Sequence, residues 1–168
     1  MESPKGFSDR VEKWLSWVPG IGTYRDRERR RETDKKIREH LASQLQEARS
    51  RLKRLTLNFS QGGQLDPLVD LDGLSAHLQQ IADTIRYASY GYGGIFDLEK
   101  IREEELDRLY TFDLSLREDL EKIRAKMEGI VQETSLESLT KKIQETEFLL
   151  DSFEEKFRLR NDFMNRPA

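Results

Sequence analysis

The sequence predicts an all-α protein, an elongated antiparallel helical bundle preceded by a short amphipathic helix. Apolar residues recur every three or four positions along four long segments, and glycine- or proline-containing breaks separate those segments. Charged residues make up 36% of the chain, which suits long helices that each bury only a narrow stripe. The four bundle helices are expected at about residues 24–61, 66–90, 97–129 and 135–160.

The composition argues against several classes of protein. The chain contains no cysteine, so disulfides and thiolate metal sites are excluded. Its apolar runs fall short of the roughly 20 residues that span a bilayer. No apolar stretch of the kind found in signal peptides follows Met1–Gly6. We therefore expect a cytoplasmic protein.

The first element, within residues 1–23, is predicted to be a short amphipathic helix that ends at Pro19-Gly20. Two tryptophans in so short a helix suit a water–lipid interface, but the same pattern suits a helix that packs on the bundle. Both interpretations stay open. The residues expected to contact a membrane or a partner are Phe7, Val11, Trp14 and Trp17.

The stretch from Arg25 to Lys36 has no apolar side chain. It is interpreted either as the solvated first part of the second helix or as a basic surface for lipid headgroups. Interleaved acidic residues weaken the second interpretation, although residues 24–58 hold twelve Lys or Arg against six Asp or Glu. The candidate cations are Arg25, Arg27, Arg29, Arg30 and Arg31.

A long helical hairpin follows. One apolar stripe runs from Ile37 to Phe59 with nearly heptad spacing, and a matching stripe runs from Leu71 to Ala88. Gly62-Gly63 breaks the first helix, and Asp66-Pro67 has the form of a helix start. The short link between matching stripes predicts an antiparallel pair.

A tyrosine- and glycine-rich corner joins this hairpin to the next helix. Glycine permits a sharp reversal there, and the aromatic rings can cover it. The segment is expected to be either a packed helix–helix corner or a surface that binds a partner protein. Its residues are Tyr87, Tyr90, Gly91, Tyr92, Gly93, Gly94 and Phe96.

The last two helices complete the bundle. Asp97 is expected to cap the first of them, and Thr134-Ser135-Leu136-Glu137 has the form of a capping box for the second. Asp113 lies on the apolar stripe, where an unpaired carboxylate is costly, so we expect Arg86 and a tyrosine hydroxyl as its partners. Residues 161–168 are expected to form a frayed tail.

Patterns typical of catalysis are missing. The two histidines, His40 and His77, lack a glutamate three residues before them, so a di-iron site is not indicated. We expect no metal or cofactor, no small-molecule substrate and no enzymatic activity. Nucleic-acid binding is a weak alternative for the basic stretch. Acidic residues alternate with its basic residues, and no aromatic residues lie between them to stack on bases.

Two stretches resemble segments of a group of uncharacterised bacterial all-helical proteins. One is Val18-Pro19-Gly20-Ile21-Gly22-Thr23-Tyr24 followed by Arg25–Leu41, and the other is Arg86–Tyr110 with its YASYGYGGIFD core. The resemblance implies a bacterial source. The layout of a short amphipathic helix, a Pro-Gly stop and a long hairpin is also similar to phage-shock membrane proteins of the ESCRT-III type.

The predicted function is that of a non-enzymatic helical scaffold or adaptor. One hypothesis has the first helix dock peripherally on an anionic membrane, at its inner surface, with the nearby arginines assisting. The alternative is a soluble bundle that binds a protein partner, or a second copy, through the tyrosine–glycine corner. Exposure of the two tryptophans is expected to favour the first hypothesis, and burial the second.

Overall fold

The computed structural model describes residues 5–18, 20–89 and 94–166, and these residues form helices joined by turns, with no β-strand among them. This confirms the predicted all-α class. The elements are α1 (Lys5–Trp17), α2 (Arg30–Gln61), α3 (Leu68–Arg86), the short 3-10 helix η1 (Ile95–Asp97), α4 (Glu103–Val131) and α5 (Leu136–Met164).

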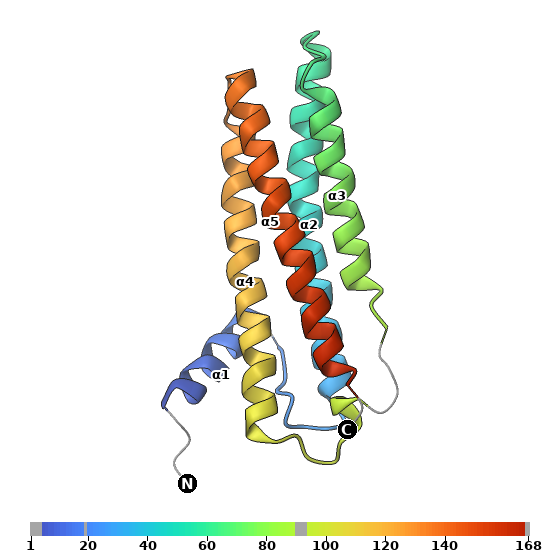
Figure 1. Ribbon diagram of the computed structural model, residues 1–168, viewed down its shortest axis with the longest axis vertical. Coiled ribbons are helices and arrows are strands. Elements are labelled where there is room, and N and C mark those ends of the chain that lie inside the picture. Colours follow the sequence, from blue (N-terminus) through green and yellow to red (C-terminus); the bar gives the residue numbers. More distant parts are fainter. Residues whose placement is uncertain (1–4, 19, 90–93, 167–168) are drawn as a thin grey trace.

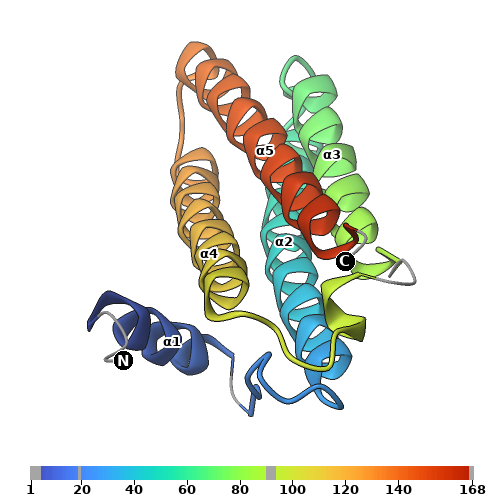
Figure 2. The same cartoon turned by 60° about the horizontal axis from the view of Figure 1, so that its bottom comes forward.

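The four long helices form two antiparallel hairpins that lie side by side (Figure 1). Within the hairpins α2 pairs with α3 and α4 with α5, and between them α2 contacts α4 and α3 contacts α5. Helix α1 lies across one end of α4, beside the loops that join the hairpins (Figures 1 and 2). We call this end of the bundle the base, and the end with the two hairpin turns the tip.

The predicted apolar stripes form the core, because each helix can bury its single stripe only against the others. Helix α2 buries its stripe from Ile37 to Leu52, and Leu55 and Phe59 beyond it are only partly buried. Fully buried positions include Leu41, Leu45, Leu74, Leu78, Leu109, Leu116, Ile123, Leu150 and Phe153.

Helix α2 begins later than the sequence suggests. Residues 24–29 form turns in which the Asp26 carboxylate accepts a hydrogen bond from the Glu28 backbone N–H, 3.1 Å away. Such side-chain bonds compete with helix formation. The expectation that residues 25–36 form a solvated face is wrong at Arg30, Thr33 and Asp34, which are buried.

The corner and the helix ends also differ from expectation. Asp97 lies in η1 rather than capping α4, whose first turn is closed by Arg102 and Glu105. At the start of α3, Asp66 makes no cap, and Pro67 takes that place without a side-chain hydrogen bond. Helix α3 ends at Arg86, before residue 90.

The C-terminal part of the chain is more ordered than predicted. Helix α5 begins after Ser135, whose hydroxyl accepts from the backbone N–H of Ser138, and it continues to Met164. Phe163 and Met164 are buried against the base, so the expected frayed tail after residue 160 is wrong at least as far as Met164. Apolar contact holds this last turn in place.

Candidate functional site

Helix α1 packs its aromatic face onto α4. The Phe7 ring lies against Tyr110, with ring centroids 6.1 Å apart. Trp14 is 0% exposed, and its indole Nε1 donates a hydrogen bond to Asp113 Oδ2 at 2.8 Å. Arg10 adds an ion pair to Asp107 of α4. The face predicted to meet a membrane therefore meets the bundle in this conformation.

The outward face of α1 is mostly polar. Trp17 and Val11 are partly buried against the core, and Trp17 meets His40 of α2 edge-on at 5.6 Å. Leu15 is the large apolar side chain of α1 that is exposed. The remaining exposed positions from residue 6 onward are Gly6, Ser8, Asp9, Glu12, Lys13 and Ser16.

The predicted cations separate into two groups. Arg25, Arg27, Arg29 and Arg31 are exposed, and two of them are in ion pairs, Arg29 with Asp26 at 3.5 Å and Arg31 with Asp97 at 2.6 Å. Arg30 is buried and is not available to a headgroup or a partner. Its guanidinium donates to four backbone carbonyls of the base loops: Tyr24 at 2.7 Å, Arg25 at 3.5 Å, Phe96 at 3.4 Å and Leu98 at 2.5 Å.

Asp113 has a tyrosine partner, as expected, but not the expected arginine. The Tyr24 hydroxyl donates to Asp113 Oδ2 at 2.8 Å, and Arg160 Nε donates to Oδ1. Arg86 is not the counterion. Its backbone carbonyl, at the end of α3, instead accepts a hydrogen bond from Arg38.

The contacts of Arg160 extend this site across the base. Its Nη1 lies 2.7 Å from Asp34 Oδ1, an ion pair without the angles of a hydrogen bond, and its Nη2 donates to the Tyr24 hydroxyl at 2.9 Å.

Asp34 also pairs with Arg38 at 2.8 Å, and Arg38 donates to the Ile85 and Arg86 carbonyls that end α3. We call the six residues Trp14, Tyr24, Asp34, Arg38, Asp113 and Arg160 the polar cluster.

The polar cluster joins all five α-helices and the link after α1. Its two carboxylates balance its two guanidiniums, so the buried charges compensate one another. Burial raises the pKa of Asp113, while Arg160 and the Trp14 and Tyr24 donors oppose that rise. Burial alone would lower the pKa of Arg160, but Asp113 and Asp34 hold it well above its usual value. These side chains are closed to solvent, which suits a structural role.

Sequence reasoning missed Asp34, Arg38 and Arg160, although a signal was present. Arg160 continues the α5 stripe three residues after Phe157, and Asp34 precedes Ile37 by three residues in α2. A charged residue at a stripe position predicts a buried pair, as it does for Asp113. Its partner cannot be found from spacing alone.

The corner combines packed and exposed positions. A Cβ on Gly94 would lie 2.4 Å from the Met164 carbonyl oxygen, so the chain passes directly against the end of α5. Phe96 stacks on Tyr24, with centroids 5.6 Å apart. Tyr87, in contrast, is 75% exposed. Tyr90, Gly91, Tyr92 and Gly93 lie outside the described residues, as does Pro19.

A groove of about 610 Å³ adjoins Tyr87, and we call it the α3–α5 groove. The end of α3 and the following residues to Ser89 form one wall, and α5 from Asp151 to Asp162 forms the other. Its charged and large aromatic lining residues are Tyr87, Asp151, Glu154, Glu155, Phe157, Arg158 and Asp162.

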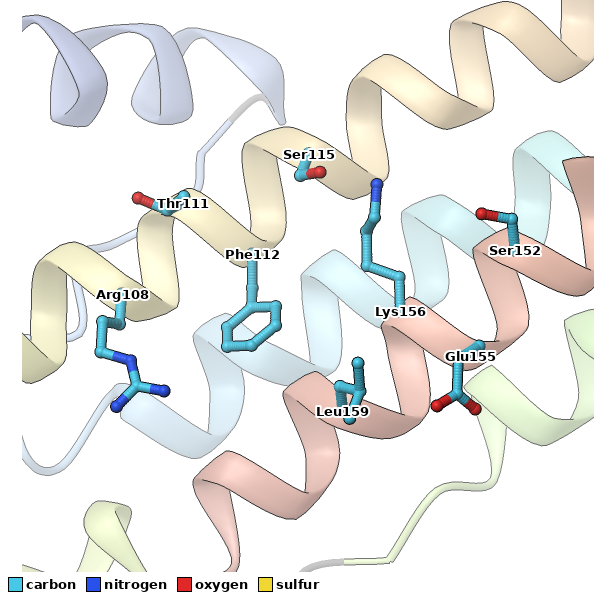
Figure 3. A pocket seen from close by; sticks show the side chains of 8 residues that line it. All are labelled: Arg108, Thr111, Phe112, Ser115, Ser152, Glu155, Lys156 and Leu159. Carbon is cyan, nitrogen blue, oxygen red and sulfur yellow. The ribbon is translucent and has the colours of Figure 1, made fainter.

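A second groove, of about 510 Å³, lies between α4 and α5 (Figure 3). Phe112 and Leu159 project into it from the two helices. Lys156 pairs with Asp119, and the Arg108 guanidinium lies 4.5 Å from the Phe163 ring centroid. This groove is largely apolar and its charges are of mixed sign.

Within residues 5–18, 20–89 and 94–166 no group of three potential metal-ligating side chains was found. Among the helices of this part of the chain, none combines the length and apolar character needed to cross a membrane. Comparison with protein-family models, with curated proteins and with solved structures finds no match to this chain.

Proposed function

We propose that this protein is a non-enzymatic helical adaptor that binds another protein at the base of its bundle, beside Tyr87. The observation that carries the proposal is the contrast between the aromatic residues of α1 and of the corner. Phe7 and Trp14 are buried in the bundle, whereas Tyr87 presents most of its surface to solvent next to a groove.

Tyrosine suits such a role. Its ring offers a large, rigid apolar face and its hydroxyl offers a hydrogen bond, and tyrosine is enriched at the energetic centres of protein interfaces. The neighbouring groove gives a partner side chain or helix a concave surface to fill. The polar cluster contacts both walls of that groove, because Arg38 of α2 donates to the carbonyls that end α3 and Arg160 belongs to α5.

Membrane docking through α1 is the less favoured proposal. It requires Trp14 to leave a buried site and Asp113 to lose a hydrogen bond, since the outward face of α1 is mostly polar. An unsatisfied buried carboxylate is costly, which opposes that opening.

Site-specific photo-crosslinking in the native host tests the adaptor proposal. A photoreactive phenylalanine analogue replaces Tyr87 in one strain and Val69 in a control strain. The two positions match in exposure, at 75% and 78%, but Val69 lies in the first turn of α3, at the tip. We expect a discrete protein adduct from position 87 and none from position 69.

The proposal is wrong if position 87 gives no protein adduct at native expression, or if both positions give the same adducts. Co-sedimentation with anionic vesicles provides a second arm. Binding by the parent protein that is abolished in a Trp14→Ala/Trp17→Ala variant would favour membrane docking instead.

A further inference from the structure

We propose that the α3–α5 groove binds a basic, lysine- or arginine-bearing helical segment of the partner protein. This inference rests on the proposed function and specifies the chemistry of the partner. It follows from the charge of the groove, its length and the position of Tyr87.

The groove is acidic. Four carboxylates line it, those of Asp151, Glu154, Glu155 and Asp162, against one guanidinium, that of Arg158. Arg158 is already neutralised within the protein, because it pairs with Glu155 at 2.6 Å and with Asp162 at 2.9 Å. The groove therefore keeps an excess of negative charge, which attracts cations.

Asp151 and Glu154 are the carboxylates best placed to meet a partner. Asp151 is largely exposed, and its Oδ1 lies 3.5 Å from His77 Nε2 of α3. Neither side chain has an ion pair with Lys or Arg among the residues that the structure describes. A partner lysine or arginine can pair with them without breaking an existing Lys or Arg bridge.

The shape of the groove suits a helix. From Asp151 to Asp162 the α5 wall rises about 16 Å, which is the length of about three helical turns. Two neighbouring helices leave a furrow into which a third can pack. Phe157 is buried beneath the groove, and Tyr87 stands at one wall as an apolar anchor for that third helix.

The groove between α4 and α5 has no comparable attraction for a basic segment. Its Lys156 is paired with Asp119, and its Glu155 with Arg158, which leaves no excess of negative charge. We therefore assign the basic segment to the α3–α5 groove.

Fluorescence anisotropy with the full-length protein tests the inference. The probe is a labelled 16-residue helical peptide of Lys, Ala and Leu, and its counterpart carries Glu in place of Lys. We expect the basic peptide to bind, the acidic peptide not to bind, and the affinity to fall as salt rises.

Two double variants remove the same charge from different places. Asp151→Asn/Glu154→Gln neutralises the groove, and Asp70→Asn/Glu137→Gln neutralises exposed acids near the tip on α3 and α5. We expect the groove variant to bind the basic peptide about fivefold more weakly and the tip variant to change affinity less than twofold. Thermal melts should show both variants folded, because all four residues lie at the surface or are only partly buried. The tip variant should melt slightly lower than the parent, since Asp70 and Glu137 lie in the first turns of their helices.

Equal weakening by both double variants, or no binding of the basic peptide, would overturn the inference. A dimer in sedimentation velocity that only the groove variant dissociates would assign the groove to a second copy and also overturn it. The Tyr87 adduct is measured independently. If it persists while the peptide result fails, the adaptor proposal stands and only the basic chemistry of its partner is wrong.

Discussion

Arg160 is buried at the centre of the base, with a partner for each of its three guanidinium nitrogens. Nε faces Asp113, Nη1 faces Asp34, and Nη2 donates to the Tyr24 hydroxyl. A buried ion pair is a weak source of net stability, but removing Arg160 would leave Asp113 charged without a counterion and would take from Asp34 one of its two arginine partners. Arg160 therefore offsets much of the cost of burying the carboxylates of Asp113 and Asp34.

We predict that Arg160→Met lowers the free energy of unfolding by about 3–5 kcal/mol, because Asp113 and Asp34 lose their shared counterion. The control is Arg158→Met on the exposed side of the same helix, which should cost less than about 1 kcal/mol. Urea denaturation measures both. Equal midpoints for the two variants would show that the polar cluster does not stabilise the base.

A second residue-scale prediction concerns Glu133, just before α5. Its carboxylate accepts hydrogen bonds from the backbone N–H groups of Thr134 and Ser135 and from the Ser138 hydroxyl, and it pairs with Lys142 at 2.6 Å. These donors, Lys142 foremost, lower its pKa from 4.5 to about 2.

Because the folded pKa of Glu133 lies below the unfolded value, its contribution to stability is present above about pH 4.5 and is lost as the pH falls toward 2. We expect Glu133→Gln to remove that part of the acid dependence, so that parent and variant stabilities converge on acidification. NMR titration of the Glu133 side chain checks the cause. A midpoint near 4.5 in the folded protein would contradict it.

At the scale of elements, the corner and the end of α5 depend on each other. Residue 94 passes so close to Met164 that only glycine fits without movement, and Phe163 and Met164 close the base from the other side. The last turn of α5 has no basic residue to interact with the helix dipole, and the tertiary contacts of Phe163 and Met164 help to hold it in place.

We predict that Gly94→Ala destabilises the protein by about 1–3 kcal/mol, because the new methyl group must displace the α5 backbone. The matched control is Gly73→Ala within α3, where a Cβ would meet nothing within 4 Å. That substitution should stabilise the protein by about 0.5–1 kcal/mol through higher helix propensity. Melting temperatures that shift in the same direction would refute the close approach at Gly94.

At the base, buried polar contacts join the helices, whereas toward the tip the ion pairs between helices, such as Arg51–Glu128 and Lys126–Glu145, lie at the surface. The polar cluster joins every long helix at the base, together with α1. Toward the tip, the buried residues of α2 end at Leu52, and exposed apolar side chains gather at Leu57, Leu65 and Val69. Local opening should therefore be easier at the tip.

Hydrogen exchange can test this difference within a single helix. In α2, the backbone amides of residues 34–48 should exchange much more slowly than those of residues 53–61, since α2 has buried side chains throughout the first range and none in the second. Mass spectrometry of overlapping peptides gives the comparison. Uniform protection along α2 would mean that the bundle opens only as a unit.

Much of this architecture could be predicted from the chain. The stripes of α2 and α3 and the glycine break between them predicted the antiparallel hairpin, and Asp113 on a stripe predicted a buried tyrosine partner. The start of α4 and the end of α5 were missed. At both places long-range contacts, such as Asp97 with Arg31 and Phe163 with the base, override the local pattern.

The sequence by itself determined that the protein is helical, how many long helices it has and which face of each is buried, because helical periodicity is a property of neighbouring residues. Only the tertiary structure decided how those faces meet. Trp14 finds Asp113 across 99 residues of sequence, and Arg160 finds Tyr24 across 136. Such pairings depend on how the helices pack around one another. That packing cannot be predicted from the spacing of residues within one helix.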